Sequence, residues 1–461
     1  MRKYDFLFLY EVKNRELESL CLLKYELERR GYSVAIVQVL HHLHRTWLCL
    51  PYSATILVTF ALYNDDRIRA FSGFCRDFKC IVNLQWEQIY RNRDESDLDT
   101  LHHIKGSACN MIHIAWGPFT ADKLIDLCGI STSNVVKAGH IAMDFTKPKF
   151  HGYYMDREML LRQYDISADK KILLFISSFS YVDIPKSILE SESYQQVGIS
   201  LMDFSQLSVL SQSTLFQWLR DILPRHPECI FIYRPHPVEI GSAMLAEMED
   251  SLPNFHVIRD FSVKQWISAA DKIYTWYSTA AADAYFCGKN FDILRPVPLP
   301  YDMELVLYNG CHFITEPQDF DRSIDCPEAG APIKEETFDR FYGYGKESYT
   351  YITISDALEA AFRDPTDRCA QFRKTPKYYT LYRIIRLPLR AGKRWVLDFL
   401  GWAYTSGHLK KIHGSLEETV KLHSYIRKSI QNNYVSKREM QMIQNRVKEI
   451  IASNTDRDCQ Q

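Results

Sequence analysis

The feature that most constrains the fold is the regular alternation of short apolar runs with helical segments. The first series of runs is "YDFLFLY", "SVAIVQV", "TILVTF", "KCIVNLQ", "MIHIAW" and "NVVKAG". Between the first two, "NRELESLCLLKYELERRG" repeats leucine at helical spacing and ends on Gly31, a typical helix stop. Continuous apolar strands separated by helices are typical of a parallel sheet that is covered on both faces.

A second series follows the polar stretch "MDFTKPKFHGYYMDRE". Its strand-like runs are "KKILLFIS", "CIFIYR", "FHVIRD", "DKIYTW" and "NFDILRP", again with helical segments between them. A chain of 461 residues is too long for one core. The pattern predicts an α/β protein with two tandem doubly wound, Rossmann-like domains, residues 1–150 and 151–370, and a helical extension, residues 371–461. Ligands of such sheets bind at the carboxyl ends of the strands, so we expect a site in a cleft between two facing domains.

Composition and motifs exclude several classes of protein. A net charge of −1 gives no general attraction to nucleic acid. Twelve cysteines without a CxxC pair, and the absence of a secretion signal or of eighteen consecutive apolar residues, favour a cytoplasmic location. No GxGxxG or GxxxxGK[ST] motif supports a dehydrogenase or a P-loop NTPase. The histidines of "HHLH" (41, 42 and 44) and His102–His103 lack an accompanying ligand set, so no metal is expected.

The turn "YRPHPVE" places a cation and an imidazole just past a predicted central strand. Arg234 and His236 are each followed by a proline, which holds the turn extended. Arginine grips phosphate through two parallel hydrogen bonds, so the pair predicts a phosphate site. The competing interpretation is structural: Arg234 caps the strand and pairs with a carboxylate such as Glu239, and His236 is satisfied within the protein.

Two further strand ends carry hydroxyl side chains. "DKIYTWYSTAAADAYFCGK" predicts a strand, then Ser278 and Thr279 at a helix start, where backbone N–H groups favour anions. In "FISSFSYVD", Ser177 and Ser178 follow another strand and are candidates for contact with phosphate or sugar. Ordinary helix caps and turn caps are the alternative for all four residues.

The turn "YRPHPVE" and the Ser278–Thr279 stretch, together with "YEVKNRELESLCLLKYELERRGY", "NLQWEQIY", "HIAWGPFTADKLIDLCG" and "VVKAGHIAMDF", resemble the GT-B glycosyltransferases of bacterial surface-carbohydrate synthesis over roughly residues 1–310. The group includes capsule and O-antigen Kdo-transferase-like proteins. Bacterial sialyltransferases and CDP-glycerol glycerophosphotransferases are more distant. The resemblance implies that Arg234, His236, Ser278 and Thr279 hold the nucleotide phosphate of a CMP- or CDP-linked donor. Where relatives show Gly-Asn-Pro-Arg and then Asp, this chain keeps Gly139 and Asp144 but has His140-Ile141-Ala142 between them.

Glycosyl transfer also needs a base that deprotonates the acceptor hydroxyl. Glu87, in "WEQ" after the run "KCIVNLQ", is the favoured base, because Trp86 beside it could form a sugar-stacking surface and raise its pKa by desolvation. Glu11, which ends the first strand, is the second candidate. Arg15 and Glu16 lie at the following helix start and are candidates for acceptor contact. A structural salt bridge of either carboxylate with Arg15 or Arg91 is the alternative.

The carboxyl-terminal part differs in composition from the rest. Residues 371–411 contain ten Lys or Arg and one acid, interleaved with aromatic and aliphatic side chains. This mixture is typical of a segment that binds an anionic membrane surface peripherally. The alternative is a segment packed inside the protein, with solvated cations. Two amphipathic helices, "SLEETVKLHSYIRKSIQNN" and "SKREMQMIQNRVKEIIASN", follow, and they could pack on the body or form a homo-oligomer.

The sequence hypothesis is therefore a metal-independent, inverting glycosyltransferase that uses a nucleotide-activated, CMP-linked sugar without a cofactor. Its acceptor would be a capsule or lipid-linked glycan at the inner face of the membrane. A CDP-polyol phosphotransferase of teichoic-acid type, a nucleotide-sugar 2-epimerase, and a non-catalytic nucleotide-sugar-binding scaffold remain the alternatives.

Overall fold

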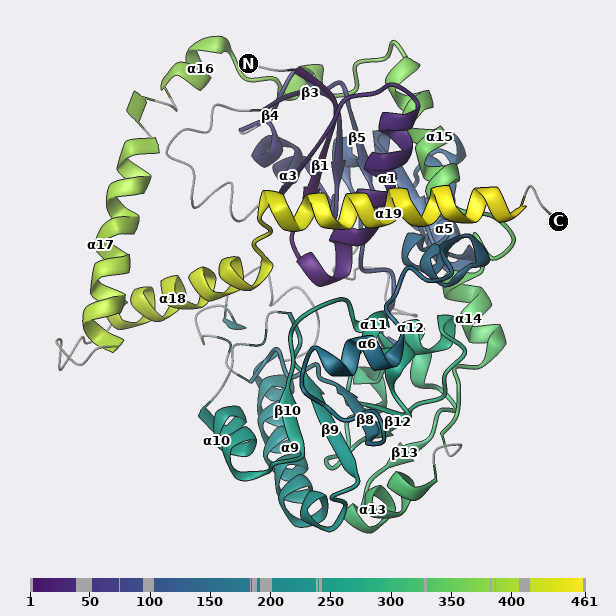
Figure 1. Cartoon of the computed structure of the whole chain (residues 1–461). Coiled ribbons are helices and arrows are strands. Elements are labelled where there is room, and N and C mark those ends of the chain that lie inside the picture. The colour runs from purple at the N-terminus through teal and green to yellow at the C-terminus, as the bar shows by residue number, and fades with distance from the viewer. Residues whose placement is uncertain are drawn as a thin grey trace. The chain divides into compact units, whose positions relative to one another are not determined.

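A computed structural model of the chain describes residues 3–38, 52–73, 75–93, 103–182, 184, 189–190, 201–237, 239, 243–326, 330–381, 384–385, 387–405 and 415–458 (Figure 1). The chain divides into two compact units, each formed by separate segments. Unit 1 comprises Met1–Gln88, Leu101–Ile141 and Phe341–Lys448. Unit 2 comprises Ile89–Thr100, Ala142–Arg340 and Glu449–Gln461.

Unit 1 is built on a parallel sheet with the strand order β2-β1-β3-β5-β6-β7, and β4 pairs with β3. Its strands are β1 (Lys3–Tyr10), β2 (Val34–Gln38), β3 (Tyr52–Thr59), β4 (Cys75–Arg76), β5 (Cys80–Asn83), β6 (Ile112–Ala115) and β7 (Val135–Lys137). Its helices include α1 (Lys13–Arg29), α3 (Asp65–Phe71), α5 (Pro118–Asp122) and α15 (Thr350–Arg363). The chain order reverses between β1 and β3, which is the topological switch point of this sheet.

Unit 2 has a second parallel sheet with the strand order β10-β9-β8-β11-β12-β13. Its strands are β8 (Lys171–Ile176), β9 (Cys229–Arg234), β10 (Phe255–Val257), β11 (Lys272–Thr275), β12 (Asp292–Leu294) and β13 (Phe313–Ile314). Its helices include α6 (Arg157–Arg162), α9 (Leu201–Ile222), α10 (Ala243–Ser251), α11 (Val263–Ala269), α12 (Ala281–Phe286) and α13 (Pro317–Asp325). This is the Rossmann order, with its switch point between β8 and β11.

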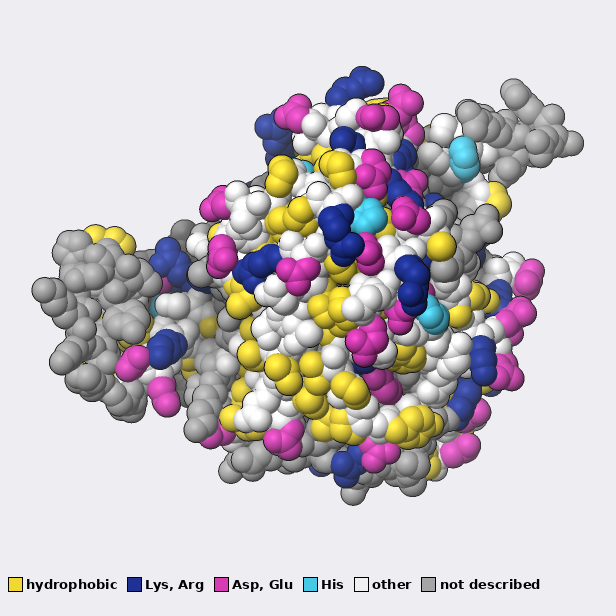
Figure 2. Space-filling model, turned by 90° about the horizontal axis from the view of Figure 1, so that it is seen from below, with side chains coloured by type: hydrophobic (Ala, Val, Ile, Leu, Met, Phe, Trp, Pro, Cys, Tyr) yellow, Lys and Arg dark blue, Asp and Glu magenta, His cyan; other side chains and the backbone are white. Residues whose placement is uncertain are grey.

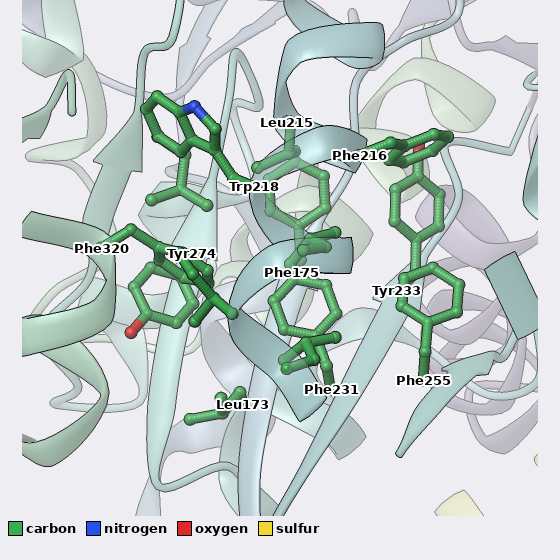
Figure 3. Packing of buried hydrophobic residues seen from close by; sticks show 14 of the residues in the cluster. Leu173, Phe175, Leu215, Phe216, Trp218, Phe231, Tyr233, Phe255, Tyr274 and Phe320 are labelled. Atoms are coloured by element: carbon green, nitrogen blue, oxygen red, sulfur yellow. The ribbon is translucent and has the colours of Figure 1, made fainter. Parts of the chain in front are cut away.

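The core of unit 2 is rich in aromatic side chains (Figure 3). Phe175, Phe231 and Phe255 come from the neighbouring strands β8, β9 and β10, and their rings lie parallel at centroid distances of 6.1 and 5.8 Å. Helices α9 and α13 add Leu215, Phe216, Trp218 and Phe320 to the same cluster. Because the central strands β8 and β9 are buried almost throughout, their runs of residues are mostly apolar, which is the pattern that made these strands visible in the sequence.

Helices form the rest of the carboxyl-terminal part: α14 (Glu335–Tyr342), α16 (Pro376–Leu381), α17 (Leu387–Thr405), α18 (Ser415–Asn433) and α19 (Lys437–Asp458). The predicted class, two Rossmann-like α/β units with a helical carboxyl-terminal extension, is thereby confirmed. Among the described helices, none combines the length and the hydropathy that crossing a bilayer requires. On the face drawn in Figure 2, cations and acids are interspersed with apolar side chains, as the net charge of −1 leads one to expect.

Candidate functional site

The six residues predicted to bind the donor nucleotide all lie at the carboxyl edge of the unit 2 sheet. Ser177 and Ser178 follow β8, Arg234 ends β9 and His236 follows it, and Ser278 and Thr279 follow β11. Since β8 lies between β9 and β11, the three loops are neighbours and flank the switch point. Loops at this position of a doubly wound sheet are where ligands bind. The structure therefore brings the six residues together, although their side chains differ in exposure.

The β8 and β9 loops are joined by a buried carboxylate. Glu239 accepts hydrogen bonds from the Ser177 hydroxyl at 2.6 Å, from the Tyr233 hydroxyl at 2.7 Å and from the His236 backbone N–H at 3.0 Å. The Ser177 and Tyr233 oxygens lie 2.8 Å apart. Burial raises the pKa of Glu239, and the three hydrogen bonds counteract that shift. Glu239 thus fixes the backbone of the His236 turn, and the His236 side chain is half-buried.

Arg234 has a different arrangement from the one expected. Its buried guanidinium donates hydrogen bonds to the carbonyl oxygens of Ile258 at 3.3 Å and Asp260 at 2.6 Å, and also to that of Phe261. The predicted partner of the structural alternative, Glu239, is used elsewhere. Arg234 therefore fastens the segment after β10 to the end of β9, and its phosphate role stays a prediction.

The β8 and β11 loops are also tied to each other. The Tyr277 backbone N–H donates to the Ser178 hydroxyl at 2.9 Å. The Tyr308 hydroxyl accepts from the Ser278 N–H at 2.7 Å and donates to the Ser278 carbonyl at 3.0 Å. The expected helix start at Ser278–Thr279 is wrong, because α12 begins at Ala281 with Ala280 as its capping residue. The Ser278 hydroxyl instead accepts from the Ala280 N–H at 3.2 Å, and Thr279 is exposed.

In unit 1, the predicted carboxylates gather around one arginine. Arg15 donates to Glu16 at 2.7 Å and to Glu87 at 2.9 Å. Glu16 is fully buried and also accepts from the backbone N–H groups of Glu11 and Val12 at 3.0 and 3.3 Å, so it holds the start of α1. These contacts give Glu16 a structural role at the helix start, and they join the loop after β1 to the loop after β5.

The charges of this cluster act on Glu11. Burial raises the pKa of Glu11, Arg15 opposes the shift, and the carboxylate of Glu87 adds to it. Burial raises the pKa of Glu16 as well. For Arg15, burial favours the neutral form, but the two carboxylates and the hydrogen bond to Glu16 hold its pKa above the usual range. The cluster therefore contains one permanent cation and carboxyl groups that bind protons more readily than usual.

The loop that carries Trp86 and Glu87 is held by buried amides. Asn83 donates to the Gln85 side-chain oxygen at 2.9 Å, and Gln88 donates to the Ile114 carbonyl at 2.8 Å while accepting from the Trp116 N–H at 2.9 Å. Gln85 has a φ of 48°, which is unusual for a residue other than glycine. Strained backbone of this kind persists only where its surroundings fix it, and it concentrates at functional sites.

Trp86 is not the open stacking surface that the sequence suggested. Its side chain is buried, and its ring meets the ring of His140 edge to face at 5.8 Å. His140 also contacts Trp116 at 4.1 Å and Tyr342 at 5.9 Å between ring centroids. Glu87, in turn, has 54% of its side chain exposed and pairs with Arg15, so desolvation by Trp86 is not a reason to prefer Glu87 as the base.

No family model and no curated protein sequence matches. Among solved structures, the wall teichoic acid polymerase TagF superimposes with a TM-score of 0.49 at 12% identity, covering 78% of this chain and 88% of that chain. UDP-GlcNAc 2-epimerase from Methanocaldococcus jannaschii gives 0.46 at 11% identity, covering 78% and 100%. The enzyme from Neisseria meningitidis gives 0.46 at 12% identity, with the same coverage. The fold assignment above rests on this chain's own strand order and not on these likenesses.

Sequence reasoning missed two residues at these edges. Arg295, at the end of β12, is buried, pairs with Glu304 at 2.9 Å, and lies against the rings of Trp276, Tyr277 and Phe313. Burial lowers its pKa, and Glu304 opposes the shift. "DILRP" repeats the strand-Arg-Pro pattern of "FIYRP", and that repeat could have identified it. His140 stands in the very segment where the chain departs from the related motif.

Some of the histidines that could bind a metal lie outside the described residues, namely His41, His42, His44 and His102. Within the described part of the chain, His226, Glu228 and Cys229 bring ligand atoms within 4.8 Å of one another. They lie at the amino end of β9, at the opposite edge of the sheet from the three loops, and His226 already pairs with Asp321 at 2.8 Å.

Proposed function

We propose that the chain is a nucleotide-sugar-dependent glycosyltransferase that needs no metal and inverts the sugar's configuration. The donor's nucleotide phosphate would bind at the carboxyl edge of the unit 2 sheet. The observation that carries this proposal is the meeting of the β8, β9 and β11 loops at a topological switch point, with His236 after β9 and Ser278 and Thr279 after β11, on either side of β8. The resemblance to GT-B glycosyltransferases implies the same role for these residues.

Departure of the nucleotide leaving group requires a fixed electropositive environment. A nucleotide phosphate that leaves the sugar gains negative charge, and donors that are already oriented stabilise this charge best. The His236 side chain is presented by a turn whose backbone Glu239 holds at 3.0 Å. Arg234 places a permanent positive charge at the base of that turn and keeps the turn in place through the carbonyls that follow β10. We therefore assign His236 to direct contact and Arg234 to positioning.

For the base, the charges of unit 1 favour Glu11 over Glu87. Burial raises the pKa of Glu11, which suits a carboxylate that must accept a proton. Glu87 is half-exposed and ion-paired with Arg15. Arg15 would then orient the two carboxylates, and Glu16 would hold the start of α1. In this proposal the Trp86 side chain packs against His140 and does not bind sugar. The exposed part of the Arg15–Glu87 pair contacts the acceptor instead.

The donor is proposed to be CMP-linked and the acceptor a surface polysaccharide or lipid-linked glycan made in the cytoplasm. Thermal melting with CMP, CDP, UMP and UDP should show which base and how many phosphates the protein binds, because a ligand of the folded state raises the melting temperature. Incubation with the matching nucleotide sugar should then release free nucleotide slowly in the absence of acceptor.

The products separate the proposal from its competitors. Release of nucleotide with free sugar of inverted anomeric configuration supports the transferase. Release of CMP from a CDP-polyol indicates the phosphotransferase, and an epimerised nucleotide sugar without nucleotide release indicates the epimerase. Binding without any turnover, with or without candidate acceptors, indicates a scaffold. Glu11→Gln should abolish nucleotide release in the transferase and leave nucleotide affinity unchanged, with Glu28→Gln on α1 as the matched surface control.

A further inference from the structure

Helix α17 turns an apolar stripe away from the helix on which it packs. The side chains of Leu389, Trp395, Phe399 and Trp402 are 68%, 70%, 53% and 55% exposed, and Val396 is 48% exposed. These residues recur at helical spacing and share one side of α17. The rings of Trp395 and Phe399 stack at 6.2 Å, and those of Phe399 and Trp402 lie 5.9 Å apart. Exposed aromatic side chains in a continuous row mark an interaction surface.

The opposite side of α17 packs on α18. A side chain at Gly401 would meet Ser424 at 3.4 Å and Val420 at 3.9 Å, so the glycine allows α17 to approach α18 closely. Asp398 accepts from His423 at 2.7 Å and lies 3.4 Å from Arg427 and 3.7 Å from Arg394. Asp398 is the one acid between residues 371 and 411, and its carboxylate is occupied by these contacts. Lys393, beside the stripe, is exposed.

The rest of the basic segment behaves differently. Phe372 and Tyr379 are buried, the Tyr379 hydroxyl donates to the Ser72 carbonyl at 2.8 Å, and Arg69 lies over the Phe372 ring. This part is packed on unit 1, as the structural alternative predicted. Among the described residues of this segment, the exposed large apolar side chains are therefore those of the stripe on α17 and those of Leu381, Ile384 and Ile385 just before it.

We propose that α17 is a docking helix for an anionic lipid surface. A helix with Trp, Phe and Leu on one side, and lysine and arginine beside them, lies in the plane of the membrane interface with its apolar side inserted. Trp side chains prefer that interface because their rings are apolar and their N–H can remain hydrated. The charge arrangement selects lipid as the occupant, since the segment's single acid faces α18 and the outer side combines apolar rings with the exposed Lys393.

The docking helix is linked to the carboxylate cluster of unit 1. At the end of α18, Asn433 accepts from the Lys13 N–H at 2.9 Å, and the Tyr10 hydroxyl donates to the Asn433 carbonyl at 3.4 Å. Lys13 also pairs with Glu439 of α19 at 2.9 Å. Lys13 opens α1, the helix that carries Arg15 and Glu16. Lipid binding through α17 does not depend on the proposed glycosyl transfer. It would, however, hold the loop between β1 and α1 near the bilayer.

Vesicle sedimentation of the full chain tests the proposal. We expect pelleting with vesicles of phosphatidylcholine containing about one-third phosphatidylglycerol, weaker pelleting with phosphatidylcholine alone, and weaker binding as salt rises above about 0.1 M. The triple substitution Trp395→Ser, Phe399→Ser, Trp402→Ser should lower the partition coefficient at least about tenfold. Lys393→Gln should lower it roughly fivefold on the anionic vesicles only.

Matched controls distinguish vesicle binding through the α17 stripe from nonspecific binding by other exposed side chains. Val209→Ser with Leu210→Ser removes exposed apolar side chains of α9, and Lys437→Gln with Arg438→Gln removes exposed cations of α19. Both control proteins should bind vesicles like the wild type. The proposal is overturned if the α17 variants and the controls bind equally, or if anionic and neutral vesicles pellet the wild type to the same small extent. It is also overturned if sedimentation velocity shows that the stripe pairs two copies of the chain and that vesicles do not compete.

Discussion

Glu239→Ala should loosen the β9 loop at a cost that can be worked out from its contacts. The carboxylate accepts from two hydroxyls and one backbone N–H, at 2.6, 2.7 and 3.0 Å. After truncation, the Ser177 and Tyr233 hydroxyls, 2.8 Å apart, can still pair with each other. One hydroxyl hydrogen and the His236 N–H then lose their acceptor. At about 1.5 kcal/mol for each unsatisfied donor, the free energy of unfolding should fall by about 3 kcal/mol.

Urea unfolding is the assay, followed through the tryptophan fluorescence to which the buried Trp266 and Trp276 of unit 2 contribute. Tyr233→Phe should cost about 1.5 kcal/mol, because one hydrogen bond to the carboxylate is lost. In a double-mutant cycle the two substitutions should be coupled by about 1 kcal/mol, since they share a contact. Glu247→Ala, an exposed acid on α10, is the control and should stay within about 0.5 kcal/mol of wild type.

The reasoning fails if Glu239→Ala costs no more than the Glu247 control, or if the cycle shows no coupling. Either result would mean that the carboxylate does not hold the turn. If the turn is held as described, Glu239→Ala should also weaken nucleotide binding by about tenfold, because His236 would no longer be preoriented.

Three further predictions concern stability. Asp292→Ala should cost about 3–5 kcal/mol in urea unfolding, because it strands the buried Lys272 ammonium now 2.5 Å away, whereas replacing both by Asp292→Leu and Lys272→Met should recover most of the loss. Burial lowers the pKa of His113 to about 4, so its neutral form stabilises the fold fully above about pH 6.5, and on the order of 3 kcal/mol should be lost as the pH falls from there to about 4. His113→Gln should flatten that pH slope, and an unchanged slope would contradict the assignment. Gly139→Ala would put a side chain 2.2 Å from the Tyr344 carbonyl and should cost at least about 2 kcal/mol, against about 1 kcal/mol for Gly31→Ala, which has a similar positive φ but open space around it.

Most of the sheet could be predicted from the sequence, because strands that are buried on both faces are continuously apolar. All eleven predicted strands are present, and the two amphipathic helices after residue 414 begin within one residue of their expected positions. The strands β4 and β13 were missed because two residues are too short to form a pattern. Helix α12 begins three residues later than the expected Ser278.

The candidate site was predictable only to the level of its loops. Strand ends identify which loops meet at a sheet edge, and that placed Ser177, His236 and Ser278 together. The side-chain partners could not be predicted from the sequence, because they come from distant parts of the chain. The carbonyls that Arg234 contacts lie 24 to 27 residues further on, and the partner of Arg15 in Glu87 lies 72 residues away. The burial of Trp86 likewise depends on His140 from another loop.

Calorimetric titration of the nucleotide identified by thermal melting tests the central claim most directly, namely that phosphate binds at the carboxyl edge of the unit 2 sheet. His236→Ala should weaken binding by about 1.5–3 kcal/mol, roughly 10- to 150-fold, through the loss of one charge-assisted phosphate contact. His226→Ala, at the amino edge of the same sheet, is the matched control and should bind like wild type. Equal affinities for wild type and His236→Ala, or an equal loss in both variants, would contradict the account.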